Sequence, residues 1–145
     1  LNAYGYQLLG ELGAEHVLVV HAEDGLDEIS LATRTHVVEL RGGVISEQTV
    51  TPEQLGIASQ SLIGLEVGSA VESAALIRDA LGKRRGAHAA KAADIIALNA
   101  GAAIYVSGVA TSMRAGVAVA HDLIYAGLAL ERIEALASFC ECLEA

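Results

Sequence analysis

The sequence predicts an α/β fold, and three observations support this class. A helical apolar pattern ends at Gly13, and the continuous apolar run of residues 17–20 follows after a short turn. Two segments rich in β-branched residues, 35–40 and 44–50, flank the sequence RGG, which suits a tight hairpin turn. Helical patterns occupy most of the rest. A helix, a short turn and a buried strand are typical of an α/β layer rather than a helical bundle.

Composition sets further bounds on the fold and on its partners. A chain of 145 residues fits one domain that is large enough to bury a core. Because 53% of the residues are hydrophobic but only 3% are aromatic, small aliphatic side chains must build that core. We therefore expect closely packed helices around a modest sheet. The net charge of −9 argues against nucleic-acid binding, which requires lysine and arginine to neutralise phosphates.

The absence of a secretory signal and the cysteine pattern favour a cytoplasmic protein. The chain shows no basic segment followed by an apolar one, so we expect no secretory signal. The longest apolar run, residues 95–106, is too short to span a bilayer and contains Asn99. Cys140 and Cys142 lack a second pair or histidines at zinc-ligand spacing. We expect them to be free, reduced thiols.

The first half of the chain predicts a helix, a strand and a hairpin. The first helix carries four apolar residues on one face: Tyr4, Leu8, Leu9 and Leu12. Because the run of residues 17–20 does not alternate with polar residues, it predicts a strand that is buried on both faces. After the hairpin, residues 51–57 contain the only proline and predict a loop with one helical turn.

The next predicted helix spans residues 69–81. Ser69 and Glu72 form a capping-box pattern at its start, and Gly82 ends it. Its apolar face continues through four residues: Ala70, Ala74, Ile77 and Leu81. Residues 83–88 are basic and predict an exposed connection.

A second helix, residues 89–107, is apolar all round, which is typical of a helix in the middle of a domain. Asn99 lies within it, and a buried amide needs hydrogen-bond partners. A structural contact with a neighbouring loop is favoured over a catalytic role. Thr111 or Ser112 can cap the following helix, which runs to Gly127, and residues 128–143 predict a final amphipathic helix.

Four carboxylates follow the first strand within six positions: Glu23, Asp24, Asp27 and Glu28. The simplest interpretation is a polar loop whose acids favour a helix N-terminus. An EF-hand is excluded because its alternating ligands and its later glutamate are absent. A general acid–base pair stays open, although sequence neighbours seldom flank one substrate bond. A magnesium site on Asp27 and Glu28 fits best, because Mg²⁺ is commonly held by one or two carboxylates plus substrate phosphates.

The remaining motifs offer no second site. His21 ends the strand, where a single histidine is more often packed and hydrogen-bonded than catalytic. The other four histidines show no ligand spacing with the carboxylates. The sequence contains no serine in a G-x-S-x-G motif and no G-x-G-x-x-G motif after a strand.

The stretch LGAEHVLVVHAEDGLDEISL resembles the C-terminal part of the anthranilate phosphoribosyltransferase family. The similarity continues through THVVEL, PEQLGI, LNAGAAIYVSG and the helix after Thr111, and covers roughly residues 8–139. DGLDE, residues 24–28, is the most specific motif, and LNAGAAIYVSG supports it.

The resemblance implies an α/β domain like those of class III phosphoribosyltransferases and nucleoside phosphorylases, with a mixed sheet and an antiparallel hairpin packed by helices. It also implies an enzyme of tryptophan biosynthesis that transfers phosphoribosyl from phosphoribosyl pyrophosphate to anthranilate and releases pyrophosphate. Family members are homodimers with a small helical domain and a larger α/β domain. Their Asp-Glu pair binds the magnesium that accompanies phosphoribosyl pyrophosphate, which implies that role for Asp27 and Glu28.

The sequence also departs from the family pattern. The family's Gly-Thr-Gly-Gly loop, Lys-His-Gly-Asn segment and arginine-bearing anthranilate pocket lie earlier in its chains and are absent here. We therefore expect residues 1–145 to be the C-terminal portion of the large α/β domain, without the N-terminal helical domain and the phosphate-binding loop, and inactive alone. The family commonly has His-Gly at His21-Ala22. A related phosphoribosyltransferase with another acceptor, or a non-catalytic domain of this ancestry, stays open.

Overall fold

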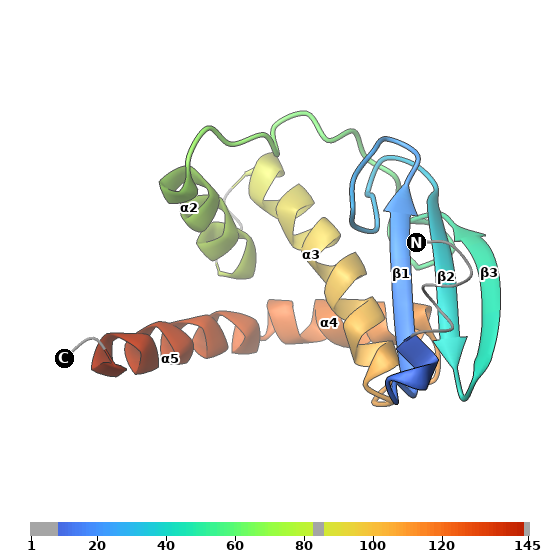
Figure 1. The fold of residues 1–145 in the computed structure, drawn as a ribbon. Coiled ribbons are helices and arrows are strands. Elements are labelled where there is room, and N and C mark those ends of the chain that lie inside the picture. Colours follow the sequence, from blue (N-terminus) through green and yellow to red (C-terminus); the bar gives the residue numbers. More distant parts are fainter. Residues whose placement is uncertain (1–8, 83–85, 144–145) are drawn as a thin grey trace.

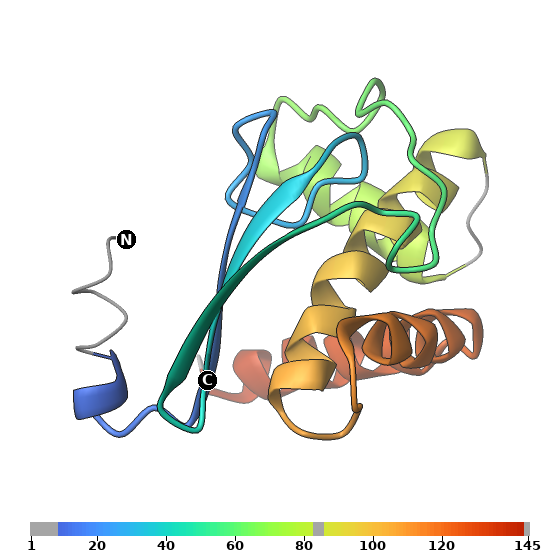
Figure 2. The same ribbon diagram turned by 90° about the vertical axis from the view of Figure 1, so that its right-hand side faces the viewer.

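The computed structural model describes residues 9–82 and 86–143, which form a sheet with helices on one side of it (Figures 1 and 2). Helix α3 lies between the sheet and α2, and α5 extends away from the sheet (Figure 1). The elements in chain order are β1 (His16–Ala22), β2 (Thr35–Arg41), β3 (Val44–Val50), α2 (Ala70–Leu81), α3 (Ala87–Val106), α4 (Met113–Tyr125) and α5 (Leu128–Leu143).

The sheet has the order β1-β2-β3, and both pairs of strands are antiparallel. The predicted hairpin is confirmed: Arg41 pairs with Val44 across a two-residue turn. Gly42 and Gly43 have φ values of 56° and 80°, as a type I′ turn requires. The expected sheet is mixed. The described residues form its antiparallel part and contain no parallel pair of strands.

The prediction that residues 17–20 are buried on both faces is wrong. These residues are half-buried, and β1 lies at the edge of the described sheet. Leu18 and Val20 pack against the core on the helical side, whereas no described helix covers the other face in the same way. A continuous apolar run reports apolar side chains on both faces of a strand, but the covering elements decide whether both faces are buried.

The chain enters β1 through a glycine turn. The N–H groups of Gly13 and Ala14 donate to the carbonyls of Gly10 and Leu9, both at 3.0 Å, and Gly13 has a φ of 88°. This geometry confirms the predicted helix end. Leu12, the last residue of the predicted apolar face, is 75% exposed. Tyr4 and Leu8, the first residues of that face, lie outside the described residues.

Helix α3 is the centre of the core, as its all-round apolar sequence predicts. Its buried residues are Ala89, Ala92, Ala93, Ala97, Leu98, Gly101, Ala102 and Tyr105. A Cβ atom at Gly116 of α4 would overlap the carbonyl oxygen of Gly101, so the two helix backbones cross in direct contact. The predicted close packing of helices is confirmed at this crossing. By length and composition α3 could also cross a membrane, and 44% of its most apolar stretch is buried inside this fold.

The predicted helix starts are confirmed. Ser69 accepts a hydrogen bond from the Glu72 N–H at 3.2 Å, and Ser112, rather than Thr111, caps α4 by accepting from the Ala115 N–H at 3.1 Å. The Glu72 carboxylate reaches back to the N–H of Gly68 at 2.7 Å. The predicted apolar face of α2 is only partly buried, since Ile77 is 38% exposed.

Three further predictions concern the connection before α3, the two cysteines and the final helix. Residues 83–85 of the predicted basic connection lie outside the described residues, and α3 already begins at Ala87. Cys140 and Cys142 are free, as predicted, and they are exposed on α5. α5 has no buried residue, although Ala129, Leu130 and Ile133 pack partly against the core.

Candidate functional site

The acidic loop, residues 23–34, leaves β1 and returns into β2 at one end of the sheet (Figure 1). Backbone hydrogen bonds close its base. The N–H of Ala22 donates to the carbonyl of Leu26 at 2.9 Å, and the N–H of Glu23 donates to the carbonyl of Arg34 at 3.0 Å. Gly25 takes a φ of 93° in the tight turn between them. The loop is therefore folded back on itself rather than extended into solvent.

The four carboxylates of this loop differ in their partners. Asp24 accepts hydrogen bonds from the Ser30 hydroxyl at 2.6 Å and from the Leu26 N–H at 3.3 Å. Glu23 accepts one from the Thr33 hydroxyl at 3.3 Å. Asp27 and Glu28 are exposed, and no hydrogen bond or ion pair is recorded for their carboxylates within the described part of the chain. The structure thus separates two structural carboxylates from two that are open to a ligand.

The segment directly after this pair is buried. Ile29, Ser30 and Leu31 are at most 1% exposed. The N–H of Ser30 donates to the Thr35 hydroxyl at 3.1 Å, and the Ser30 hydroxyl accepts from the N–H of Ala32 at 2.9 Å. Buried polar groups are normally satisfied in this way. Two exposed carboxylates therefore stand directly before three residues that the core holds in place.

Asn99 links the acidic loop to α3. Its Oδ1 accepts from the Ile29 N–H at 2.8 Å, and its Nδ2 donates to the Ile29 carbonyl at 3.0 Å. The same Nδ2 also donates to the Ile95 carbonyl at 3.0 Å, one turn earlier in α3. The predicted structural contact between Asn99 and a neighbouring loop is confirmed, and its partner is the residue that follows Glu28.

A groove of ≈ 410 Å³ lies beside Glu28. The acidic loop, α2, α3 and the segment between β3 and α2 form its walls. Its lining is mainly apolar and includes Leu26, Leu62, Leu65, Leu76, Ile95 and Ile96. One of the two open carboxylates therefore borders an apolar wall, and Asp27 does not line it.

His21 does not have the packed position that was predicted for it. It is exposed at the end of β1 and pairs in register with His36 of β2. The prediction that it is packed is wrong, because it is exposed, and the alternation along β1 places it on the face opposite Leu18 and Val20. His16 instead is half-buried and hydrogen-bonded, with its Nε2 2.8 Å from Glu39 Oε1.

A polar cluster that sequence reasoning missed lies around His16, at the end of the sheet opposite the acidic loop. Tyr105 donates to Glu39 at 2.6 Å, and Arg41 donates to the Tyr105 hydroxyl at 3.2 Å. The hydrogen bond to Glu39, together with burial, raises the pKa of Tyr105 above its ordinary value of 10.0. The cluster joins β1, β2 and α3, and only the strand register combined with the helix position could have revealed it.

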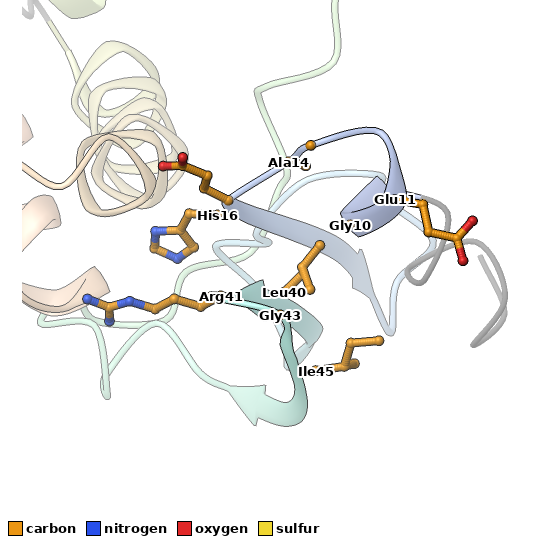
Figure 3. A pocket seen from close by; sticks show the side chains of 11 residues that line it. Gly10, Glu11, Ala14, His16, Leu40, Arg41, Gly43 and Ile45 are labelled. Carbon is orange, nitrogen blue, oxygen red and sulfur yellow. The ribbon is translucent and has the colours of Figure 1, made fainter.

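An open hollow of ≈ 1010 Å³ lies next to this cluster. In Figure 3, His16 and Arg41 lie on one side of the strands, Leu40 and Ile45 lie on the other, and Glu11 points away. Much of its lining is glycine and alanine backbone around the two turns that enter β1 and join β2 to β3. These side chains do not converge on one point, so the hollow is a weaker candidate than the acidic loop.

The metal chemistry of the molecule can be judged from its donor groups. No group of three or more His, Cys, Asp or Glu side chains that could hold a metal occurs within residues 9–82 and 86–143. These described residues therefore form no zinc or calcium site built from three or more such side chains. Asp27 and Glu28 offer hard oxygen ligands from two adjacent residues, which suits an ion that completes its shell with water and substrate oxygens, as Mg²⁺ does.

Comparison with protein-family models matches residues 5–130 to the glycosyl transferase family, a/b domain. The curated anthranilate phosphoribosyltransferase of Cellvibrio japonicus is 62% identical over 138 residues, which are 95% of this chain and 40% of that protein. The enzyme of the same name from Azotobacter vinelandii is 58% identical over 91% of this chain and 38% of its own length. The chain thus spans about 40% of the length of these relatives.

Solved structures agree with this assignment. The crystal structure of anthranilate phosphoribosyltransferase from Thermus thermophilus superposes with a TM-score of 0.79 at 35% identity, over 92% of this chain and 38% of that one. The enzyme from Saccharomyces cerevisiae in complex with PRPP and Mg has the same fold, with a TM-score of 0.66 at 21% identity over 81% of this chain and 33% of that one. Because the family model matches 126 of the 145 residues, this chain belongs to the glycosyl transferase family and carries its a/b domain.

Proposed function

We propose that this chain is part of an anthranilate phosphoribosyltransferase, the enzyme that joins anthranilate to the ribose of phosphoribosyl pyrophosphate in tryptophan biosynthesis. Within it, we assign Asp27 and Glu28 to the magnesium that accompanies phosphoribosyl pyrophosphate. The observation that carries the assignment is the difference among the four loop carboxylates. Asp24 and Glu23 are hydrogen-bonded within the loop, whereas Asp27 and Glu28 have open oxygen atoms.

The identity of 52–62% to several anthranilate phosphoribosyltransferases supports the reaction class. The yeast enzyme holds PRPP and Mg in one complex, and this supports the pairing of metal and substrate. Bound Mg²⁺ would offset the negative charge that grows on the departing pyrophosphate. The contribution of this chain is to hold two carboxylates at the end of a strand, where α/β folds bind ligands.

The proposal covers the arrangement of the whole protein as well. We place residues 1–145 in the C-terminal portion of the large α/β domain of a cytoplasmic homodimer. In that arrangement the phosphate-binding loop and the anthranilate pocket come from other parts of the polypeptide. We expect the 145 residues alone not to catalyse transfer, because both substrates must be held in a reactive geometry, which can lower a barrier by about 7–11 kcal/mol. Product formed by the purified, mass-verified chain would contradict this expectation.

Steady-state assays with phosphoribosyl pyrophosphate, anthranilate and varied magnesium test the site assignment in the intact enzyme. Asp27→Asn and Glu28→Gln should lower turnover and raise the magnesium concentration that gives half-maximal rate. Glu23→Gln is the matched control, because it removes an exposed charge from the same loop without touching the pair. Wild-type rates at limiting magnesium in both variants would refute the assignment. A lowered melting temperature in both variants, with wild-type substrate binding below that temperature, would show that the pair has a structural role instead.

A further inference from the structure

Asn99 holds the backbone at the position that determines where Glu28 points. It is hydrogen-bonded to both the N–H and the carbonyl of Ile29, the next residue after Glu28. We propose that Asn99 is a positioning residue that presents the Asp27–Glu28 pair to a magnesium-bound polyphosphate. This inference rests on the proposed function, because it assigns Asn99 an effect on the same metal site.

The side chain of Asn99 is itself firmly held. One hydrogen of its amide nitrogen goes to Ile29 and the other to the Ile95 carbonyl, both at 3.0 Å. With the Ile29 N–H at 2.8 Å on its oxygen, the amide makes three hydrogen bonds, and this network fixes which end is oxygen. Its neighbours Ala97 and Leu98 are fully buried. Asn99 therefore transmits the position of the central helix to the loop.

The other flank of the pair is also fixed. Asp24 accepts from the Leu26 N–H, and the Leu26 carbonyl accepts from the Ala22 N–H at 2.9 Å. Asp27 and Glu28 are thus the two residues between a fixed Leu26 and a fixed Ile29. Their backbone is held from both sides while their carboxylates stay exposed. This arrangement is expected where oxygen ligands must be ready for a metal without being engaged by the protein.

A purely structural role for Asn99 makes a different prediction. If Asn99 only ties α3 to the loop, its replacement lowers stability and leaves metal affinity unchanged once the protein is folded. If it positions the pair, metal affinity falls even at a temperature where every variant is fully folded. Outer residues that orient metal ligands typically contribute 10–100-fold to affinity, and for two exposed ligands we expect about tenfold.

The test uses the intact enzyme with Mn²⁺ as the probe metal and inorganic pyrophosphate as the probe polyphosphate. Mn²⁺ affinity is measured in the presence of pyrophosphate by water proton relaxation, for the wild type and for Asn99→Ala and Asn99→Asp. Asn99→Asp keeps an acceptor for the Ile29 N–H but loses the donor to the Ile29 carbonyl, so it remains informative if Asn99→Ala does not fold. Leu98→Val is the control, because it trims the core that also contains Ile29 and Leu31 while the hydrogen bonds of Asn99 to the loop stay in place. Hydrogen exchange at the Ile29 amide reports directly whether the contact is lost.

We expect faster exchange at the Ile29 amide and about tenfold weaker Mn²⁺ binding in Asn99→Ala. A smaller loss is expected in Asn99→Asp, and wild-type affinity in Leu98→Val. Unchanged affinity in folded Asn99 variants with rapid exchange at Ile29 would overturn the positioning role while leaving the metal site intact. If the Asp27→Asn and Glu28→Gln variants instead bind Mn²⁺ with wild-type affinity, the proposed function fails, and the positioning role fails with it.

Discussion

The acidic loop and helix α5 are both surface elements, but they are held in opposite ways. The loop has no regular secondary structure, yet three consecutive residues in it, Ile29, Ser30 and Leu31, are almost completely buried. α5 is a regular helix of 16 residues without a single buried one, and Leu136, Phe139 and Leu143 are 61–71% exposed. The loop exposes charge over a buried anchor, whereas the helix exposes apolar side chains.

The difference shows that regular backbone and tight attachment are separate properties. In α5 the backbone N–H and C=O groups between the end turns pair within the helix, so they need no partners from the rest of the fold. The acidic loop cannot satisfy its backbone internally, and side chains from elsewhere must do so. Asn99 of α3 and Thr35 of β2 provide such partners. Precision in the loop therefore comes from distant residues, which is what a site of open carboxylates needs.

The largest expected effect comes from one chemical change made in both regions. Leu31→Ala removes a fully buried side chain and should lower the free energy of unfolding by about 2–5 kcal/mol. Leu136→Ala removes a side chain that is 61% exposed and should change it by less than about 0.5 kcal/mol. Urea denaturation followed by circular dichroism measures both values. Equal losses of unfolding free energy in the two variants would show that α5 is held as firmly as the loop, which would contradict the comparison.

A smaller effect separates the carboxylates within the loop. Asp24→Ala removes the acceptor for the Ser30 hydroxyl and should cost about 1 kcal/mol. Asp27→Ala removes no recorded hydrogen bond, so the free energy of unfolding should stay at the wild-type value. The same denaturation experiment applies to both. A cost for Asp27→Ala that matches the cost for Asp24→Ala would place Asp27 in the loop framework and weaken its case as a ligand.

The smallest expected effect concerns Glu53, an exposed carboxylate outside both regions. Hydrogen bonds from the Ser59 hydroxyl and from backbone N–H groups lower the pKa of Glu53 from 4.5 to about 2. Because the folded pKa lies below the unfolded one, its contribution is present above pH 4.5 and is lost as the pH falls toward 2. Glu53→Gln should therefore lower the melting temperature slightly at neutral pH and match the wild type at a pH of about 2. A constant difference across this range would rule out the ionised carboxylate as its source.

Local signals in the sequence predicted much of the fold. Ser69 and Ser112 cap helices, and Gly13 ends one, because these residues act on backbone groups a few positions away. The hairpin follows from Gly42 and Gly43 in the same way. The burial of β1 was mispredicted because it depends on the elements that pack against the strand. The residues of the strand itself do not indicate which elements these are.

The candidate site was predicted in part for the same reason. The sequence indicates an acidic loop after a strand and an amide in an apolar helix that needs a partner. It does not indicate that Asn99 meets Ile29, since 70 positions separate them. Nor does it separate Asp24 from Asp27, because that distinction depends on the Ser30 hydroxyl being folded back onto one of them. Pairings of this kind are set by tertiary structure.

The central claim is that Asp27 and Glu28 serve a metal-bound substrate and contribute little to folding. The most direct test is the change in melting temperature of the intact enzyme when Mg²⁺ and phosphoribosyl pyrophosphate are added together, in the wild type and in the double variant Asp27→Asn, Glu28→Gln. Ligand at about 100 times its Kd stabilises a protein by about 2.7 kcal/mol, which raises the melting temperature measurably. We expect that rise in the wild type and its loss in the double variant, with an equal or slightly higher melting temperature of the variant without ligand. An unchanged ligand-induced rise in the double variant, or a lower melting temperature without ligand, would contradict the account.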